Sequence, residues 1–295
     1  MFDFRYHALS LAAVLLALAV GVLLGVAIGD SNLVSSAKNG VVAGLRTSVH
    51  TTQRTNARLR AEVAGQSTVE TDLSALAVNG ALRGKSVGLV FLGQASTAIV
   101  PLVRGAVSAA GGDLAVVASL REPLDLPGLA AALDGTRYSA LATPGAGQSA
   151  LIEAFGRRVG VQIARGGSLL ERASNRLLSS LSGGIGGLDA VAVVRDDPTG
   201  LSNTEQRALA AIQTGLVAGL QAVPLPVVGV ELVVTKPSQV AWYQSQGMSS
   251  VDDAELLPGR TALALALAGD HGTFGVKRTA DSLLPQAVSS APPGA

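Results

Sequence analysis

Residues 86–92 read SVGLVFL, an apolar run of the kind that forms a strand buried on both faces of a sheet. Further strands are expected at Leu114–Ala118, Ala190–Val194 (AVAVV), Val227–Val234 (VVGVELVV) and Thr261–Leu267. Helices are expected between them, at Ala98–Ala110, Thr204–Leu220 and Ser238–Gln246. The last strand could instead be helical, because its alanines have low β-propensity. Apolar strands alternating with helices predict an α/β fold with a Rossmann-like, mostly parallel sheet.

Composition limits the classes of function. The 295 residues include 22 Lys and Arg against 21 Asp and Glu, and only 15% are charged. This balance argues against a nucleic-acid binder, which normally carries a clustered basic face. The absence of cysteine excludes disulfides, thiolate metal sites, iron–sulfur clusters and a cysteine nucleophile.

An uncharged stretch lies near the N-terminus, at Ala8–Ile28. As a helix it would be about 31 Å long, which matches a hydrocarbon core of about 30 Å. We therefore expect residues 1–30 to form a single-pass membrane anchor. The alternative is a cleavable signal peptide, with Ala27-Ile28-Gly29 as the cleavage site, although the apolar run exceeds the usual length of about 7–15 residues.

Small residues recur every fourth position in this stretch, at Ala17, Gly21, Gly25 and Gly29. Such a stripe lets a second membrane helix approach closely, so it predicts helix packing in a dimer or higher homo-oligomer. Basic residues flank the stretch on both sides, with Arg5 before it and Lys38 and Arg46 after it. Charge alone therefore leaves the orientation open.

Residues 31–78 contain no proline and no β-like run, so a helical stalk is expected. Read as heptads, the a positions are Val42, Val49, Asn56 and Val63, and the d positions are Leu45, Thr52, Leu59, Gln66 and Leu73. The spacing predicts a coiled coil, in which an Asn at one a position fixes register and strand number. The alternative is a single helix packed on another element, since Thr52 and Gln66 are poor d residues.

The remainder divides into a globular domain, residues 85–284, and a tail, residues 285–295, expected to be disordered. The loop after the first strand, Gly93–Thr97, has no phosphate-binding glycine pattern, and the chain has no nucleophile elbow. The histidines are His7, His50 and His271. We therefore expect no catalytic residues and no enzymatic activity.

Two acidic pairs and one loop are the remaining candidates. Asp196-Asp197 and Asp252-Asp253 could each bind a hard cation. The favoured interpretation is that Asp196-Asp197-Pro198 forms a turn and that Asp252 caps a helix or strand. The glycine-rich loop Gly269–Gly275 contains Asp270 and His271, the candidate metal ligands. Alternatively, His271 only forms hydrogen bonds within its loop.

Two segments resemble one known family. The opening FRYHALSLAAVLLALAVGVLLG and the late segment VDDAELLPGRTALALALAGDHGTFGVKRTADSLLP are similar to the actinobacterial family named for mycobacterial copper transport protein B (MctB). The resemblance implies a channel-like protein of the cell envelope, in copper efflux or homeostasis, with its α/β domain outside the cytoplasm. Some relatives are instead accessory regulators of peptidoglycan hydrolases in cell-wall remodelling and division.

Copper is implied by this resemblance alone. Cu(I) prefers thiolate and thioether ligands and Cu(II) prefers imidazole, yet the chain has no Cys, two Met and three His. The expected partners are the membrane, a second copy of the chain, and a cell-wall hydrolase or other envelope protein, but not nucleic acid. A third class of function, a degenerate nucleotide-binding or hydrolytic domain, would place its ligand near Gly93 or Asp196.

Overall fold

The computed structural model describes residues 4–29 and 31–286, and within these it leaves the side chains of residues 4, 5, 31–40 and 64 undescribed. The tail expected at 285–295 therefore lies almost entirely outside the described residues. The chain divides into two compact units, Met1–Thr68 and Val69–Ala295. Each unit is described separately.

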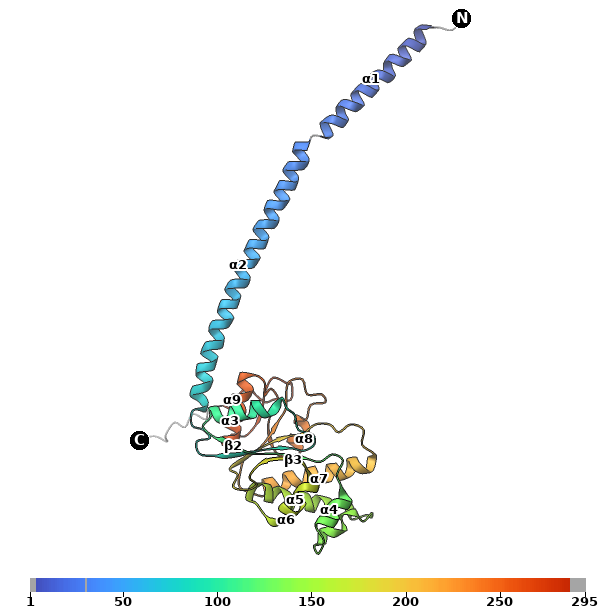
Figure 1. The fold of residues 1–295 in the computed structure, drawn as a ribbon. Helices are drawn as coiled ribbons and strands as arrows, with labels where there is room; N and C mark the ends of the chain where they lie inside the picture. Colours follow the sequence, from blue (N-terminus) through green and yellow to red (C-terminus); the bar gives the residue numbers. More distant parts are fainter. Residues whose placement is uncertain (1–3, 30, 287–295) are drawn as a thin grey trace, which may run out of the picture. The chain divides into compact units, whose positions relative to one another are not determined.

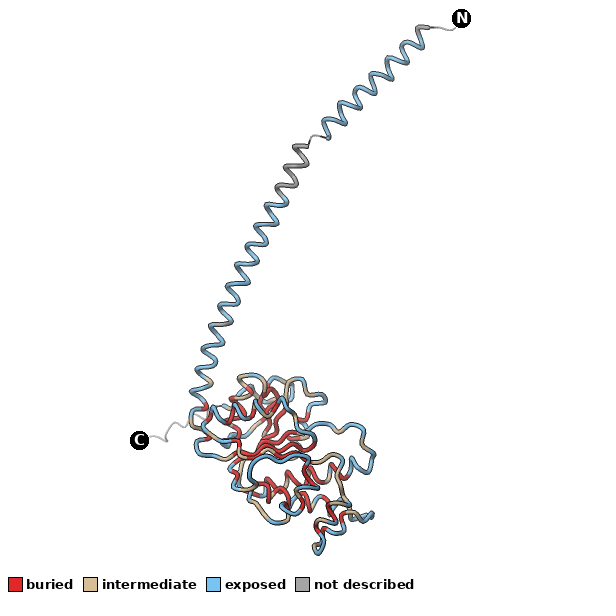
Figure 2. The backbone as a smooth tube through the Cα atoms, viewed as in Figure 1, coloured by how far each residue is buried: buried red, intermediate tan, exposed pale blue. Residues whose placement is uncertain are grey.

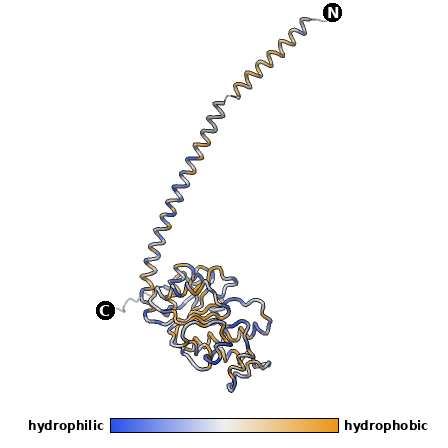
Figure 3. The backbone as a smooth tube through the Cα atoms, in the orientation of Figure 1, coloured by the Kyte–Doolittle hydropathy of each residue, from blue (hydrophilic) through white to orange (hydrophobic). Residues whose placement is uncertain are grey.

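The first unit is helical. Helix α1 spans Phe4–Ile28, and α2 begins at Ser31 and runs for 48 residues to Val78, so its end belongs to the second unit. Within α1, Tyr6–Ile28 is long and apolar enough to cross a membrane, a property that N-terminal signal sequences share. Figure 3 shows the contrast between the apolar α1 and the mixed polarity of α2.

The second unit contains a seven-stranded, mostly parallel sheet in the order β3-β2-β1-β4-β5-β6-β7. The strands are β1 (Ser86–Phe91), β2 (Asp113–Leu120), β3 (Leu178–Gly183), β4 (Ala190–Val194), β5 (Val227–Val230), β6 (Ser249–Val251) and β7 (Thr273–Phe274). All neighbours pair in parallel except β3, which pairs antiparallel with β2 at one edge. The predicted α/β class and mostly parallel sheet are confirmed.

Helices cover both faces of this sheet. They are α3 (Ile99–Ala109), α4 (Leu126–Ala132), the 3-10 helix η1 (Arg137–Ala142), α5 (Gln148–Arg165), α6 (Ser168–Leu177), α7 (Asn203–Gln221), α8 (Val240–Ser245) and α9 (Leu257–Ala268). Figure 1 shows α3 and α9 on one face and α5, α6 and α7 on the other. The two faces have separate apolar cores, and Figure 2 shows the buried strands between them. The helix after β1 is α3 and the helix after β4 is α7, so these two helices lie on opposite faces of the sheet.

Local sequence explains how several elements begin and pack. Helix α7 starts at a capping box, in which Ser202 accepts from the Glu205 amide and Glu205 accepts from the Ser202 amide. Helices α5 and α7 approach at backbone contact distance, because glycines replace side chains where they meet. At Gly160, an added Cβ would collide with the carbonyl of Leu216. This contact fixes α5 and α7 as one layer under the sheet.

Two expectations for strands need correction. Thr261–Leu267 is not a strand but part of α9, because its Ala and Leu residues favour a helix and Pro258 lies in the first turn. The strand expected at Val227–Val234 ends at Val230, because the next residue, Glu231, receives hydrogen bonds from the loop before α8. The other strands and helices named from the sequence are present, with boundaries that differ by at most two residues.

Candidate functional site

The candidate metal ligands His271 and Asp270 lie in the loop between α9 and β7. Both residues are exposed at the rim of a cavity of about 150 Å³ on the amino-terminal edge of the sheet. The other lining residues are Gln221, Leu225, Pro226, Val227, Val228, Gly247, Ser249 and Ala266. The structure thus places the two predicted ligands together at the rim of a cavity whose lining is both polar and apolar.

This loop has the hydrogen bonds that its glycines allow. The amide of Gly272 donates to Oγ of Ser249, and its carbonyl accepts from the amide of Ser250. Gly272 has a φ of 150°, within the left-handed region that favours glycine. No hydrogen bond involves the His271 ring within the described part of the chain, so the loop is held by its backbone and the imidazole faces solvent.

The donor set at this rim is small. Within the described residues, no group of three or more His, Cys, Asp or Glu side chains is placed to hold a metal ion. His271 and Asp270 would offer one imidazole and one carboxylate, a combination that suits Cu(II) better than Cu(I). Two donors can contact an ion that passes, but they do not form a closed site.

A second cluster lies at the opposite, carboxyl edge of the sheet. Glu231 follows β5 and is 1% exposed. Its Oε1 lies 2.5 Å from Nζ of Lys277 and accepts from the Ser238 hydroxyl, while its Oε2 accepts from the amide of Gln239 at 2.6 Å. The Lys277 ammonium also donates to the carbonyl of Leu232. The buried carboxylate of Glu231 is therefore matched by one cation and two further hydrogen bonds.

Asp252 connects the same segment to β6. Its carboxylate accepts from the amide of Val276 at 2.9 Å and from that of Lys277 at 3.3 Å. Gly275 allows this approach, because a Cβ there would collide with the carboxyl group of Asp252. Burial raises the pKa of Asp252, while the two backbone amides lower it. Residues 275–277 are thus joined to the ends of both β5 and β6.

Asp253 has a different environment. Its carboxyl group is fully buried, and neither oxygen has a hydrogen-bond partner among the described residues. Burial, with the neighbouring charges of Asp252 and Glu255, raises its pKa to about 6. Asp252, predicted to cap a helix or strand, does not cap the next helix, because α9 has Leu256 at its N-cap and no side-chain cap. No cation-binding group is formed around Asp252 and Asp253 within the described residues.

The other acidic pair, Asp196-Asp197, follows β4 at the same edge, and both residues are exposed. Burial is the main cause of a raised pKa at Asp196, and Arg195 counteracts it. Gly93 follows β1 beside the end of β4, where the amide of Leu92 donates to the carbonyl of Val194. Gly93 and Asp196, the expected surroundings of a nucleotide-class ligand, therefore do lie at neighbouring strand ends.

The predicted helix contacts lie on exposed surfaces. Ala17, Gly21, Gly25 and Gly29 are exposed, and no atom lies within 4 Å of a Cβ built at Gly21 or Gly25. The apolar residues of the predicted seam are between 39% and 63% exposed, and they are Val42, Leu45, Val49, Leu59 and Val63. Asn56 is exposed on the same helix. The coiled coil remains a prediction.

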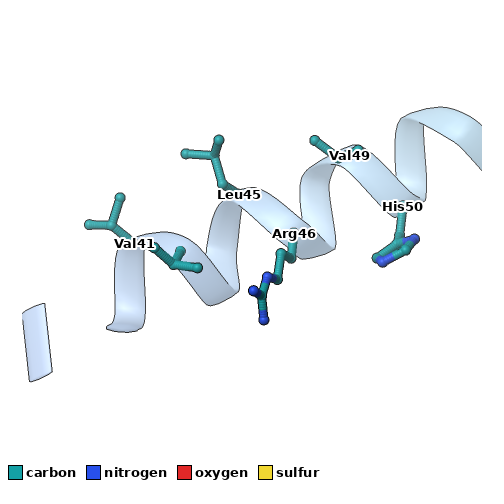
Figure 4. A pocket seen from close by; sticks show the side chains of 6 residues that line it. Val41, Leu45, Arg46, Val49 and His50 are labelled. Carbon is teal, nitrogen blue, oxygen red and sulfur yellow. The ribbon is translucent and has the colours of Figure 1, made fainter. Parts of the chain in front are cut away.

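Part of this seam lines a hollow of about 270 Å³ along α2. Figure 4 shows Leu45 and Val49 on one side of the helix and Arg46 and His50 on the other. The apolar side is the one predicted to meet a partner. Within the described residues nothing covers it.

Sequence reasoning missed Glu231 and Lys277. Glu231 is a single acid inside the apolar run VVGVELVV, which by its composition resembles one continuous strand. That isolated charge was the available signal, because a charge in a buried strand needs a partner. Lys277 gives no comparable signal, since it lies in a polar segment and meets Glu231 only through the fold.

A comparison with protein families shows the family of the chain. The family model described as "Copper transport outer membrane protein, MctB" matches residues 1–285. The chain belongs to the MctB family. No curated protein matches it. The family description associates the chain with copper transport and with the outer membrane. The matched region contains both α1 and the seven-stranded sheet.

Proposed function

We propose that the chain is a non-enzymatic component of copper transport and homeostasis in the cell envelope. The observation that carries this proposal is the MctB family match over residues 1–285, and the apolar helix Tyr6–Ile28 supports membrane anchoring. In this proposal α1 anchors the protein in a single pass. The α/β domain, Rossmann-like in its strand order, lies outside the cytoplasm.

Copper is the cargo of this protein and not a resident cofactor. Of the described residues, the rim formed by His271 and Asp270 suits brief contact with Cu(II), since it offers an imidazole and a carboxylate in solvent. An open pair of donors releases an ion readily, as a transport component requires. A storage protein would need a closed set of soft ligands.

Assembly is part of the same proposal. The exposed apolar seam of α2 and the small-residue stripe of α1 both favour a homodimer or higher homo-oligomer. Parallel chains anchored in one membrane would pair Val42 with Val42 and Leu45 with Leu45 of the second copy. One α1 helix cannot enclose a channel, so any conduction needs several copies.

Growth of a deletion strain in copper tests the function. The account predicts copper sensitivity that is rescued by the full chain and only partly by His271→Ala, with His50→Ala as the matched control. Unchanged copper tolerance of the deletion strain would contradict it. Failure of His271→Ala to differ from wild type would remove only the proposed contact residue.

A second candidate function is a scaffold that controls a cell-wall hydrolase. The observation that favours it is the uncovered apolar seam of α2, which could meet a helix of another protein instead of a second copy. A chaining or septation defect without copper sensitivity in the deletion strain would support this candidate over copper transport.

A further inference from the structure

A half-buried guanidinium stands at the point where the strand order reverses. Arg195 directly follows β4, which pairs with β1, and the helices after these two strands leave on opposite faces. In open parallel sheets, ligands bind outside the carboxyl ends of the strands at such a reversal. Arg195 therefore occupies the position where folds of this class bind their ligands.

The surroundings of Arg195 hold it in one orientation. Its Nε donates to Oε1 of Gln213 at 3.0 Å, its Nη1 donates to Oε1 of Gln239, and its guanidinium lies 4.9 Å from the ring centre of Trp242. Gln213 is 1% exposed and is itself held by the carbonyl of Leu92 at 2.6 Å. Two buried amides and an indole therefore position one cation.

No carboxylate neutralises this guanidinium at close range. Among the described residues, none of the ion pairs includes Arg195. Burial lowers the pKa of Arg195, and the charges of Asp197 and Asp196 only partly oppose that effect. An oriented guanidinium held by neutral groups is suited to an incoming carboxylate or phosphate.

Two acids, Glu122 and Asp196, follow β2 and β4, the two strands that flank β1 in the sheet. Glu122 follows β2, and its Oε2 is 2.8 Å from the position that a Cβ of Gly93 would occupy. Burial, and then the charge of Asp196, raises the pKa of Glu122. Neither acid takes part in an ion pair within the described residues. A positive group placed here would relieve their repulsion, whereas a doubly charged phosphate would be repelled.

We propose that this carboxyl edge binds a small zwitterion of the amino-acid class, with Arg195 holding its carboxylate and Glu122 and Asp196 facing its ammonium group. A ligand of this kind satisfies both sets of charges with one molecule. The site is independent of the proposed copper contact, because His271 lies at the opposite edge of the sheet.

Calorimetric titration of the full chain in detergent micelles tests the proposal. The probe is L-alanine, and the matched probes are propionate, which lacks the ammonium group, ethylammonium, which lacks the carboxylate, and inorganic phosphate. The expected result is binding of L-alanine with a Kd of about 1 mM or tighter. Propionate and ethylammonium should each bind at least about tenfold more weakly, a difference of about 1.4 kcal/mol.

Variants assign the contacts. Arg195→Gln should abolish L-alanine binding, Arg195→Lys and Glu122→Gln should each weaken it about tenfold, and exposed Arg158→Gln should leave it unchanged. Thermal unfolding of each variant without ligand checks folding. If Arg195→Gln does not fold, Glu122→Gln decides the matter. Absence of L-alanine binding, equal binding of propionate, preference for phosphate, or full binding by Glu122→Gln would overturn the proposal.

Discussion

The Nζ atom of Lys277 lies 2.5 Å from Oε1 of Glu231, and this contact joins the segment after β7 to the carboxyl end of β5. The Lys277 side chain is 16% exposed and that of Glu231 is 1% exposed. Removing one partner of such a pair leaves a buried charge without compensation, which costs more than the pair itself contributes. The two residues lie 46 positions apart in sequence. The fold thus depends on a contact between two distant segments.

Lys277→Met should lower the free energy of unfolding by about 3–5 kcal/mol, because Glu231 remains buried without its cation. Adding Glu231→Gln should restore part of the loss. Lys85→Met is the control, since the Lys85–Asp189 pair is more exposed and such pairs contribute about 0–1 kcal/mol. Denaturant unfolding of the full chain in detergent measures wild type and these variants. Equal effects of the two lysine variants would contradict this assignment.

Asp253→Asn should stabilise the protein at pH 8 and not at pH 4. The folded state raises the pKa of Asp253 from 3.8 to about 6, so it holds the proton more tightly than the unfolded state does. The contribution of that proton to the free energy of unfolding is complete below about pH 4 and is lost as pH rises through about 6. The gain from Asn at pH 8 is therefore up to about 3 kcal/mol.

Thermal or denaturant unfolding between pH 4 and pH 8 checks this dependence. Exposed Asp134→Asn is the matched control. A gain for Asp253→Asn that is the same at both pH values would show that the carboxyl group does not change its protonation over this range.

Gly160→Ala should destabilise the α/β unit by about 1–3 kcal/mol, because the added methyl meets the Leu216 carbonyl of α7 and must push the helices apart. Gly105→Ala is the control on α3, where nothing lies within 4 Å of the new Cβ. That change should stabilise by about 0.5–1 kcal/mol through helix propensity alone. Opposite signs for the two variants in denaturant unfolding are the expected outcome.

The stalk prediction concerns the oligomeric state. Leu45→Asp combined with Leu59→Asp should convert a dimer of the full chain into a monomer, because both residues occupy d positions of the predicted seam. Ala57→Asp, on the same helix but off the seam, should leave the dimer intact. Sedimentation equilibrium in detergent distinguishes these cases. A wild-type chain that is already monomeric would contradict the coiled coil.

Much of the fold follows from local patterns. The strand AVAVV at Ala190–Val194 is apolar throughout because both of its faces are covered by helices. The start of the helix at Asn203 is predicted by Ser202 and by Glu205 three residues later, which together form a capping box. In both cases the signal lies within a few residues of the element that it predicts.

The rest depends on contacts between distant residues. No element was expected between Leu120 and Ala190, yet α4, η1, α5, α6 and β3 lie there. Helix α5 contains glycines at positions that pack against α7, and glycine in a helix weakens the local signal. The short strands β6 and β7 were also missed, because two or three residues give no periodicity to read.

The candidate sites divide in the same way. The loop around His271 was recognisable from its glycines, and the structure places it at a cavity rim. The orientation of Arg195 could not be foreseen, because it is set by two residues distant in sequence. Gln213 lies in α7, and Gln239 is the N-cap residue of α8. Residues that position a charge carry no sequence pattern of their own.

The central claim is that this MctB family member acts in copper transport, and cellular copper content tests it most directly. We would measure copper by mass spectrometry in wild-type cells, in a deletion strain, and in that strain carrying either the full chain or a chain without residues 1–30, after growth in added copper. The account predicts raised copper in the deletion strain, restored by the full chain but not by the shortened chain. Equal copper content in all four strains would contradict it.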